Sequence, residues 1–216
     1  MTRYRMKNSV LISLFLLLFC KTPECQGQPS SGVADDSYSA SWKPLIPQDF
    51  DKGLFRMTFD ISRNHITGLL MIKRISANSI RMVFTNEIGI QFFDLEFEDD
   101  KFIIHSIFPS MNRHGLLTLL EKDFRIILFQ KNKIKKISVL KSKIPETEKY
   151  LVRTGIGTFT YFVDAKTKKI IRINTNKSIM AKAILAITHN PEGLPNQIGI
   201  YNPTQKLRIN LLLISN

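Results

Sequence analysis

Apolar and polar residues alternate through the stretch from Ile66 to Ile107, in short runs separated by turn-forming residues. Every second residue is apolar in Ser79–Asn86 and again in Ile90–Glu98. A period of two places the apolar and polar sets on opposite faces of a strand. The breaks between the runs contain Asn, Gly and Asp and are short enough for hairpins. The stretch is therefore predicted to be an antiparallel meander with one apolar face and one polar face.

The period changes after Pro109. In Ser110–Phe129 the apolar residues recur at spacings of three and four, which predicts an amphipathic helix. They are Leu116, Leu117, Leu120, Phe124, Ile127 and Leu128. Ser110 or Asn112 could cap the start of this helix. Its apolar stripe is the natural cover for the apolar face of the meander.

Alternating segments also precede and follow these elements. Leu54–Asp60 is predicted to be the first strand, and a second β block begins near Tyr150. The clearest strands of that block are Gly157–Asp164, Lys168–Thr175, Ile179–Thr188, Ile198–Tyr201 and Lys206–Ile214. The order is about five strands, one main helix and about five more strands. The expected fold class is mainly β, or α+β, with about ten strands.

The N-terminus indicates export. Residues 1–19 combine three basic residues and no acids with the apolar run Val10–Phe19, which has the length of a signal-peptide core. The run is too short to span a bilayer comfortably as a permanent helix. With 44% hydrophobic and 23% charged residues, the chain fits one ordinary globular domain. We expect that domain at residues 42–216, after a flexible Pro-, Gly- and Ser-rich tether at 20–41.

Cys20 directly follows the apolar run, and Leu17-Leu18-Phe19-Cys20 resembles a bacterial lipobox, with Phe19 where a small residue is usual. A lipobox implies acylation of Cys20 with chains such as palmitate and a lipid anchor there. The alternative is cleavage after Gly27, which removes both cysteines. Neither route leaves a disulfide in the mature domain, so the fold depends on its hydrophobic core.

The chain is basic, with a formal net charge of +13. Six lysines and no acids occur in 130–143: Lys131, Lys133, Lys135, Lys136, Lys141 and Lys143. This run could be a solvated hairpin or loop, or it could contact anionic lipid. Nucleic acid is the least favoured partner, because the run lacks interleaved aromatic residues and an exported protein rarely meets nucleic acid.

Catalytic chemistry is not indicated. The four histidines are scattered, without the converging spacing that a metal site needs. The acids of Asp94–Asp100 alternate onto the polar face of a strand or fall in a hairpin turn. The lone Gly155-Ile156-Gly157 has no helix pattern after it, so a phosphate loop is not supported. We therefore expect no enzymatic activity, no catalytic residue, no metal and no cofactor.

The apolar content leaves two interpretations of the interior. A curved antiparallel sheet that is rich in Phe, Leu, Ile and Met can fill its own interior, or it can leave a groove for acyl chains. The sequence alone does not separate a filled core from a lipid groove.

The order of these elements resembles the LolA/LolB-type lipoprotein carriers of the Gram-negative envelope. The resemblance covers Trp42 to Asn216 and rests on the lipobox, the polar tether, the meander, the helix and the closing β block. It implies a strongly bent antiparallel half-barrel wrapped round the main helix, with acyl chains held on its concave face. The residues expected to line this groove are Leu70, Ile72, Met82, Phe84, Phe93, Leu95 and Phe97. Ile88, on the loop after the third strand, matches a hydrophobic residue that helps to insert cargo into the membrane.

The function that this resemblance implies is non-enzymatic. A monomeric outer-membrane lipoprotein facing the periplasm, anchored through its N-terminal lipid, would bind lipid acyl chains or lipoproteins and receive or insert lipoproteins. The alternative is an envelope scaffold lipoprotein with a filled core, which binds a protein partner through its basic surface.

Overall fold

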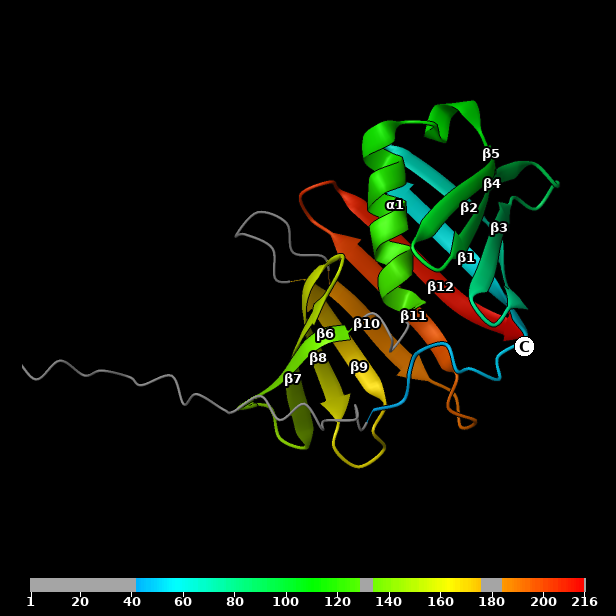
Figure 1. Ribbon diagram of the computed structural model, residues 1–216. Coiled ribbons are helices and arrows are strands. Elements are labelled where there is room, and N and C mark those ends of the chain that lie inside the picture. The colour runs from blue at the N-terminus through cyan, green and yellow to red at the C-terminus, as the bar shows by residue number, and fades with distance from the viewer. Residues whose placement is uncertain (1–41, 129–133, 176–183, 216) are drawn as a thin grey trace, which may run out of the picture. The chain divides into compact units, whose positions relative to one another are not determined.

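One antiparallel sheet and one α-helix dominate the structure (Figure 1). The computed structural model describes residues 42–128, 134–175 and 184–215. Within these residues the elements are β1 (Lys52–Ile61), β2 (Asn64–Ser76), β3 (Ser79–Thr85), β4 (Gln91–Glu98), β5 (Lys101–Ile107), the 3-10 turn η1 (Pro109–Met111), α1 (His114–Ile127), β6 (Ile134–Leu140), β7 (Thr147–Thr154), β8 (Gly157–Asp164), β9 (Ile170–Thr175), β10 (Ile184–His189), β11 (Pro195–Asn202) and β12 (Leu207–Ser215).

Two meanders make up the sheet. The strand order is β5-β4-β3-β2-β1-β12-β11-β10-β9-β8-β7-β6. Consecutive strands pair within β1–β5 and within β6–β12, and β1 pairs with β12. That pair joins the first strand to the last, with Met57 opposite Leu211. β5 and β6 form the two ends of an open sheet, and α1 connects them in the chain and crosses one face (Figure 1). The predicted mainly β fold, with a meander on either side of a single helix, is confirmed.

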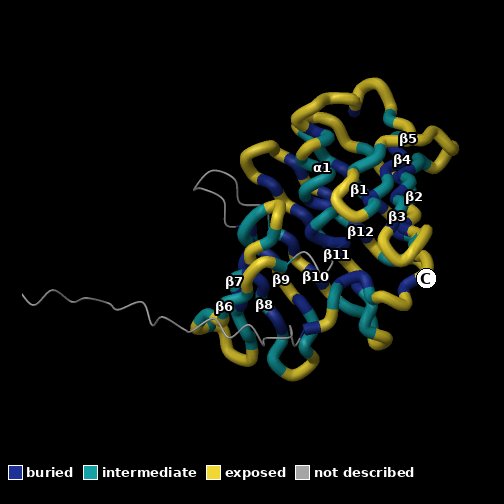
Figure 2. The backbone as a smooth tube through the Cα atoms, in the orientation of Figure 1, coloured by how far each residue is buried: buried dark blue, intermediate teal, exposed yellow. Residues whose placement is uncertain are grey.

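Burial alternates along the strands as the sequence predicts (Figure 2). In β12, Leu207, Ile209 and Leu211 are fully buried, while Arg208 is exposed. The inward residues of both meanders therefore form one hydrophobic core against α1.

The sheet has more strands than the sequence predicted. The lysine-rich run, interpreted as a hairpin or loop, supplies the edge strand β6, which pairs with β7 in a hairpin. This strand was not predicted because β6 is only half-buried and its many lysines interrupt the apolar alternation. Lysines on an edge strand also discourage pairing with another chain. The predicted strand at Ile179–Thr188 begins at Ile184 within the described residues.

The helix prediction was correct in type and wrong at its start. Pro109 opens the separate 3-10 turn, and α1 begins only at His114. The N-cap is Arg113, without a side-chain cap, so neither Ser110 nor Asn112 caps the helix. Asn112 has a ψ of 65°, and this non-helical backbone separates the two segments.

Gly68 marks a close approach between strands. A Cβ atom at this position would lie 2.0 Å from the carbonyl oxygen of Thr85, where the chain leaves β3. Gly68→Ala is therefore expected to lower the free energy of unfolding by about 1–3 kcal/mol, because the backbone must shift. Gly115→Ala is the control, since a Cβ there meets nothing within 4 Å. We expect it to raise stability by roughly 0.5–1 kcal/mol. Urea denaturation measures both, and an equal effect of the two substitutions would contradict this interpretation.

Candidate functional site

The inward faces of β2, β3 and β4 form a continuous apolar surface beneath α1. All seven residues predicted to line an acyl-chain groove lie on this surface. Each is at most 3% exposed: Leu70, Ile72, Met82, Phe84, Phe93, Leu95 and Phe97. The alternation therefore gave the correct phase for all three strands. Their contact with acyl chains stays a prediction.

Side chains of α1 fill the space above this surface. The ring of Phe124 lies 5.9 Å from that of Phe93 and 6.4 Å from that of Phe97, between ring centres. Ile126 lines a pocket together with Phe159 and Tyr161 of β8, which belong to the second meander. The helix thus packs on strands from both meanders.

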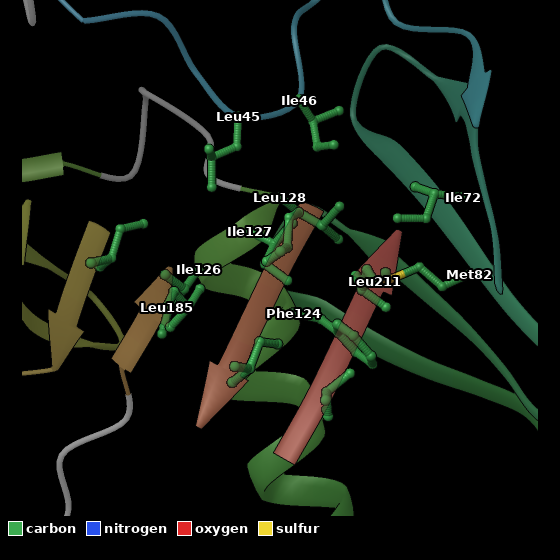
Figure 3. Close-up of a cluster of buried hydrophobic side chains, with 14 of the residues drawn as sticks. Leu45, Ile46, Ile72, Met82, Phe124, Ile126, Ile127, Leu128, Leu185 and Leu211 are labelled. Atoms are coloured by element: carbon green, nitrogen blue, oxygen red, sulfur yellow. The ribbon is translucent and has the colours of Figure 1, made fainter. Parts of the chain in front are cut away.

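The segment 42–50 is a second cover that the sequence did not reveal. No strand or helix was predicted for it, yet its apolar residues are buried: Trp42, Leu45, Ile46 and Phe50. Leu45 and Ile46 point toward the C-terminal end of α1 (Figure 3). Arg74 of β2 fixes the segment, donating to the carbonyl oxygens of Phe50 and Pro47, each at 3.0 Å. The sequence did not predict this burial, because the segment contains Pro44 and Pro47 and its apolar residues follow neither a strand nor a helix period.

A pocket of about 70 Å³ lies at the C-terminal end of α1, where the β4–β5 turn approaches the β7–β8 turn. Its lining includes Phe97, Arg125, Ile126, Leu128, Phe159 and Tyr161. Pockets that hold drug-sized ligands measure about 300–1,000 Å³. Of the seven predicted groove residues, only Phe97 lines it. This pocket is therefore too small to hold an acyl chain.

Arg125 fastens the last turn of α1 to the rim of this pocket. Its Nη1 and Nη2 atoms donate to the carbonyl oxygens of Asp99 and Asp100 at 2.9 and 2.8 Å. Its Nε atom donates to Glu121 at 3.0 Å, and the guanidinium carbon lies 5.6 Å from the ring centre of Phe97. One side chain thus joins the helix to the β4–β5 turn.

Asp123 is the exception on the apolar face of α1. Helical spacing places it on the same face as Leu120, three residues earlier, and Ile127, four residues later. The side chain is fully buried, and neither carboxyl oxygen has a hydrogen-bond partner among the described residues. Burial raises the pKa of Asp123 to about 7, although Lys122 acts in the opposite direction. The sequence analysis missed this residue, but its position within the apolar stripe could have revealed it.

Trp42 carries a second buried polar atom. Its ring stacks on Tyr161 at 5.6 Å and meets Tyr150 at 4.8 Å, between ring centres. Its Nε1 donor has no hydrogen-bond partner in the part of the chain that the structure describes. Since Tyr161 lines the pocket, Trp42 lies immediately behind the pocket wall.

Similarity to known proteins is structural. No family model matches the chain, and no curated protein matches it. A LolA superfamily protein from Nitrosomonas europaea aligns over 78% of this chain and 86% of its own, with 8% identity and a TM-score of 0.53. The domain has the LolA superfamily fold.

Two further structures align with lower TM-scores. One, from Vibrio parahaemolyticus, is described as an outer membrane lipoprotein-sorting protein domain. It shares 9% identity, over 76% of this chain and 83% of its own, with a TM-score of 0.45. The other is a DUF1329 family protein from Desulfovibrio piger, with 9% identity over 77% of this chain and 85% of its own, also at 0.45. We base the fold assignment on the first structure alone.

The acids on the outer face of this LolA-like domain are engaged in pairs. Asp94 accepts two hydrogen bonds of 2.7 Å from Arg81. Glu96 accepts from the Ser79 hydroxyl at 2.5 Å and lies 2.6 Å from His105, contacts that lower the pKa of Glu96. The described residues contain no group of three or more His, Cys, Asp or Glu side chains that could hold a metal ion.

The β3–β4 turn of the LolA-like domain presents Ile88 to solvent, with 81% of the residue exposed. The Asn86 carboxamide oxygen shapes this turn by accepting from the backbone N–H groups of Ile88 and Ile90 at 3.2 and 2.7 Å. No described helix is long and apolar enough to span a bilayer. A role for Ile88 in membrane contact stays a prediction.

The basic surface lies on and after the edge strand β6. Lys135 and Lys136 are exposed on β6, and Lys141 and Lys143 are exposed in the loop after it. Lys131 and Lys133 lie outside the described residues, as does Cys20. The structure thus places the basic surface away from the inward face.

Proposed function

We propose that this protein is an outer-membrane lipoprotein, anchored through Cys20, that binds acyl chains beneath α1 and receives or inserts lipoproteins. The observation that carries the proposal is an extensive apolar surface lying under a single helix on an open sheet. The LolA superfamily fold supports the same interpretation. The export and anchoring parts of this proposal rest on the predicted signal peptide and on Cys20. In the proposal the protein faces the periplasm from the outer membrane.

Acyl-chain binding requires that α1 or the segment 42–50 move away from the sheet. Side chains of α1 and of the segment 42–50 pack against the inward faces, and the pocket at the end of α1 measures only about 70 Å³. Because α1 is the only α-helix among the described residues, its displacement exposes the inward residues of β2–β4 without breaking a strand pair. The Arg125 contacts with the β4–β5 turn are among those that must open.

The length dependence of acyl binding tests this proposal. Each buried methylene contributes about 0.8 kcal/mol, so the affinity for a monoacylated peptide should rise roughly fourfold per added methylene. The fluorescence of Trp42 reports binding, because it is the only tryptophan and lies behind the pocket wall. The same peptide without its acyl chain is the control. An affinity independent of chain length would contradict an acyl-binding interior.

A scaffold function is the second candidate, and the filled interior is the observation that favours it. In that case the core stays closed, and the exposed lysines at Lys135, Lys136, Lys141 and Lys143 bind an acidic protein partner. The scaffold predicts no response of Trp42 to acylated peptides. It also predicts partner binding that weakens steeply with salt.

Ile88 is expected to act in delivery to the membrane. Ile88→Ser should slow the transfer of a bound acylated peptide to phospholipid vesicles several-fold, because less apolar surface enters the bilayer. Stability should change by no more than about 0.5 kcal/mol, since the side chain is exposed. Ile75→Ser is the matched control, because Ile75 is 50% exposed on β2, outside that turn. Equal transfer rates for the two variants would remove Ile88 from this role.

A further inference from the structure

Acyl-chain binding alone does not explain why an aspartate, Asp123, is buried in the apolar core. Its side chain is fully buried, and its carboxyl oxygens have no hydrogen-bond partner among the described residues. A buried polar group without such a partner is costly, and native structures contain few of them. A leucine at the same position would complete the apolar stripe without that cost. A polar residue that breaks the local pattern of a core marks a functional requirement.

The carboxyl faces the middle of the sheet. At about 100° per residue around the helix axis, Asp123 lies about 100° from Phe124 and about 60° from Ile126, in opposite directions. Phe124 faces β4, where its ring meets Phe93, and Ile126 faces the pocket that Phe159 and Tyr161 of β8 also line. Asp123 therefore lies between the two contact sides of α1, above the surface that acyl chains would occupy.

The position is also close to the existing opening. Ile126, which is three residues further along the same face of the helix, lines the pocket. A ligand that widens this pocket by lifting the end of α1 therefore reaches Asp123 within one helical turn. The acyl chains would continue along the inward faces of β2–β4, and the polar end of the ligand would stay near the carboxyl.

No cationic side chain among the described residues donates a hydrogen bond to this carboxyl. Lys122 precedes it on α1 without a hydrogen bond to it, and Arg125 is committed to Glu121 and to the β4–β5 turn. In an apolar interior, an ionised carboxylate is stabilised by a cation that also donates hydrogen bonds. A ligand that enters the interior can supply such a cation.

We propose that Asp123 binds the ammonium group of a diacyl lipid, as the polar anchor of the acyl-binding interior. The proposal rests on the proposed function and specifies its ligand class. Two kinds of lipid carry an ammonium group near paired acyl chains. One is a lipopeptide whose diacylated N-terminal cysteine keeps its free amine, and the other is an ethanolamine phospholipid. Acetylation of the amine removes the cation from both and leaves the acyl chains unchanged.

The test compares four ligands on the full-length protein. They are a dipalmitoylated cysteinyl peptide and dipalmitoyl phosphatidylethanolamine, each with a free and an acetylated amine. We expect the protein to bind a free-amine lipid at least about tenfold more tightly than its acetylated form, as for a hydrogen bond to a charged group. The pair that shows this difference identifies the source of the ammonium group. Asp123→Asn should abolish the difference and keep the affinity for the acetylated lipids.

Glu87→Gln is the control, because Glu87 is an exposed carboxyl on the β3–β4 turn. It should retain the full discrimination. Equal binding of the free and acetylated forms to the unmodified protein would overturn the role of Asp123 while leaving acyl-chain binding intact. No binding of any of the four lipids would overturn both proposals. The ligand comparison on the unmodified protein remains decisive even if Asp123→Asn fails to fold.

Discussion

Asp123→Asn is expected to stabilise the protein by up to about 4 kcal/mol at pH 8 and to have little effect at pH 4. Burial raises the pKa of this carboxyl from 3.8 to about 7, and each pKa unit corresponds to about 1.36 kcal/mol. Between pH 4 and 7 the folded state holds a proton that the unfolded state has released. The contribution of Asp123 to stability is therefore fully present below pH 4 and is lost as pH rises toward 7. Asparagine mimics the protonated form and does not ionise.

Denaturation curves at several pH values measure this effect as a difference between the variant and the unmodified protein. Taking the difference removes the contributions of Glu96, Glu148 and Asp164. The pKa of each of these carboxyls is lowered, so each stabilises the fold at higher pH and ceases to do so in acid. Glu87→Gln, on an exposed turn, should leave the curve unchanged. A constant difference from pH 4 to pH 8 would show that Asp123 does not stay neutral in the folded protein.

Phe124→Ala is expected to lower the free energy of unfolding by about 3–5 kcal/mol. The ring is fully buried and meets Phe93 and Phe97 of β4, so its removal leaves a cavity at the centre of the helix–sheet contact. Chemical denaturation measures the loss. The matched control is Phe108→Ala, because Phe108 is 39% exposed and packs edge-on against Phe92. Its cost should stay below about 1 kcal/mol.

The same substitution separates the two candidate functions. If acyl chains replace α1 side chains against the sheet, the cavity left by Phe124→Ala makes that replacement easier. The variant should then bind acylated peptides more tightly while being less stable. A scaffold with a closed core predicts the loss of stability alone.

The inward faces were predictable from the sequence because alternation is a local property. Met82 and Phe84 could be assigned to one face of β3 without knowledge of what covers that face. The helix was predictable for the same reason, since its apolar residues repeat at three and four. Its start was not, because the backbone at Asn112 departs from the helical conformation for reasons that no local spacing expresses.

The burial of the segment 42–50 and of Asp123 depends on tertiary contacts, which a local sequence pattern does not express. Trp42 and Leu45 are buried in a segment that Arg74 bonds through the carbonyl oxygens of Phe50 and Pro47. Neither Trp42 nor Leu45 belongs to a periodic pattern. Asp123 lies at a position that the helical period assigns to the core. Because its side chain is polar, the pattern of apolar residues does not include it. In the proposed function, these features determine how the interior opens and which ligands it binds.

Photocrosslinking with a diacylated peptide tests the central claim most directly. The peptide carries a photoactivatable diazirine within one acyl chain, and the crosslinked residues are mapped by mass spectrometry. Acyl binding beneath α1 predicts crosslinks to inward residues such as Phe84 and Phe93, and to Phe124 on the facing helix. Crosslinks confined to exposed residues of the outer face, such as Met71 and Leu212, would show that acyl chains do not enter the interior, and would contradict the account.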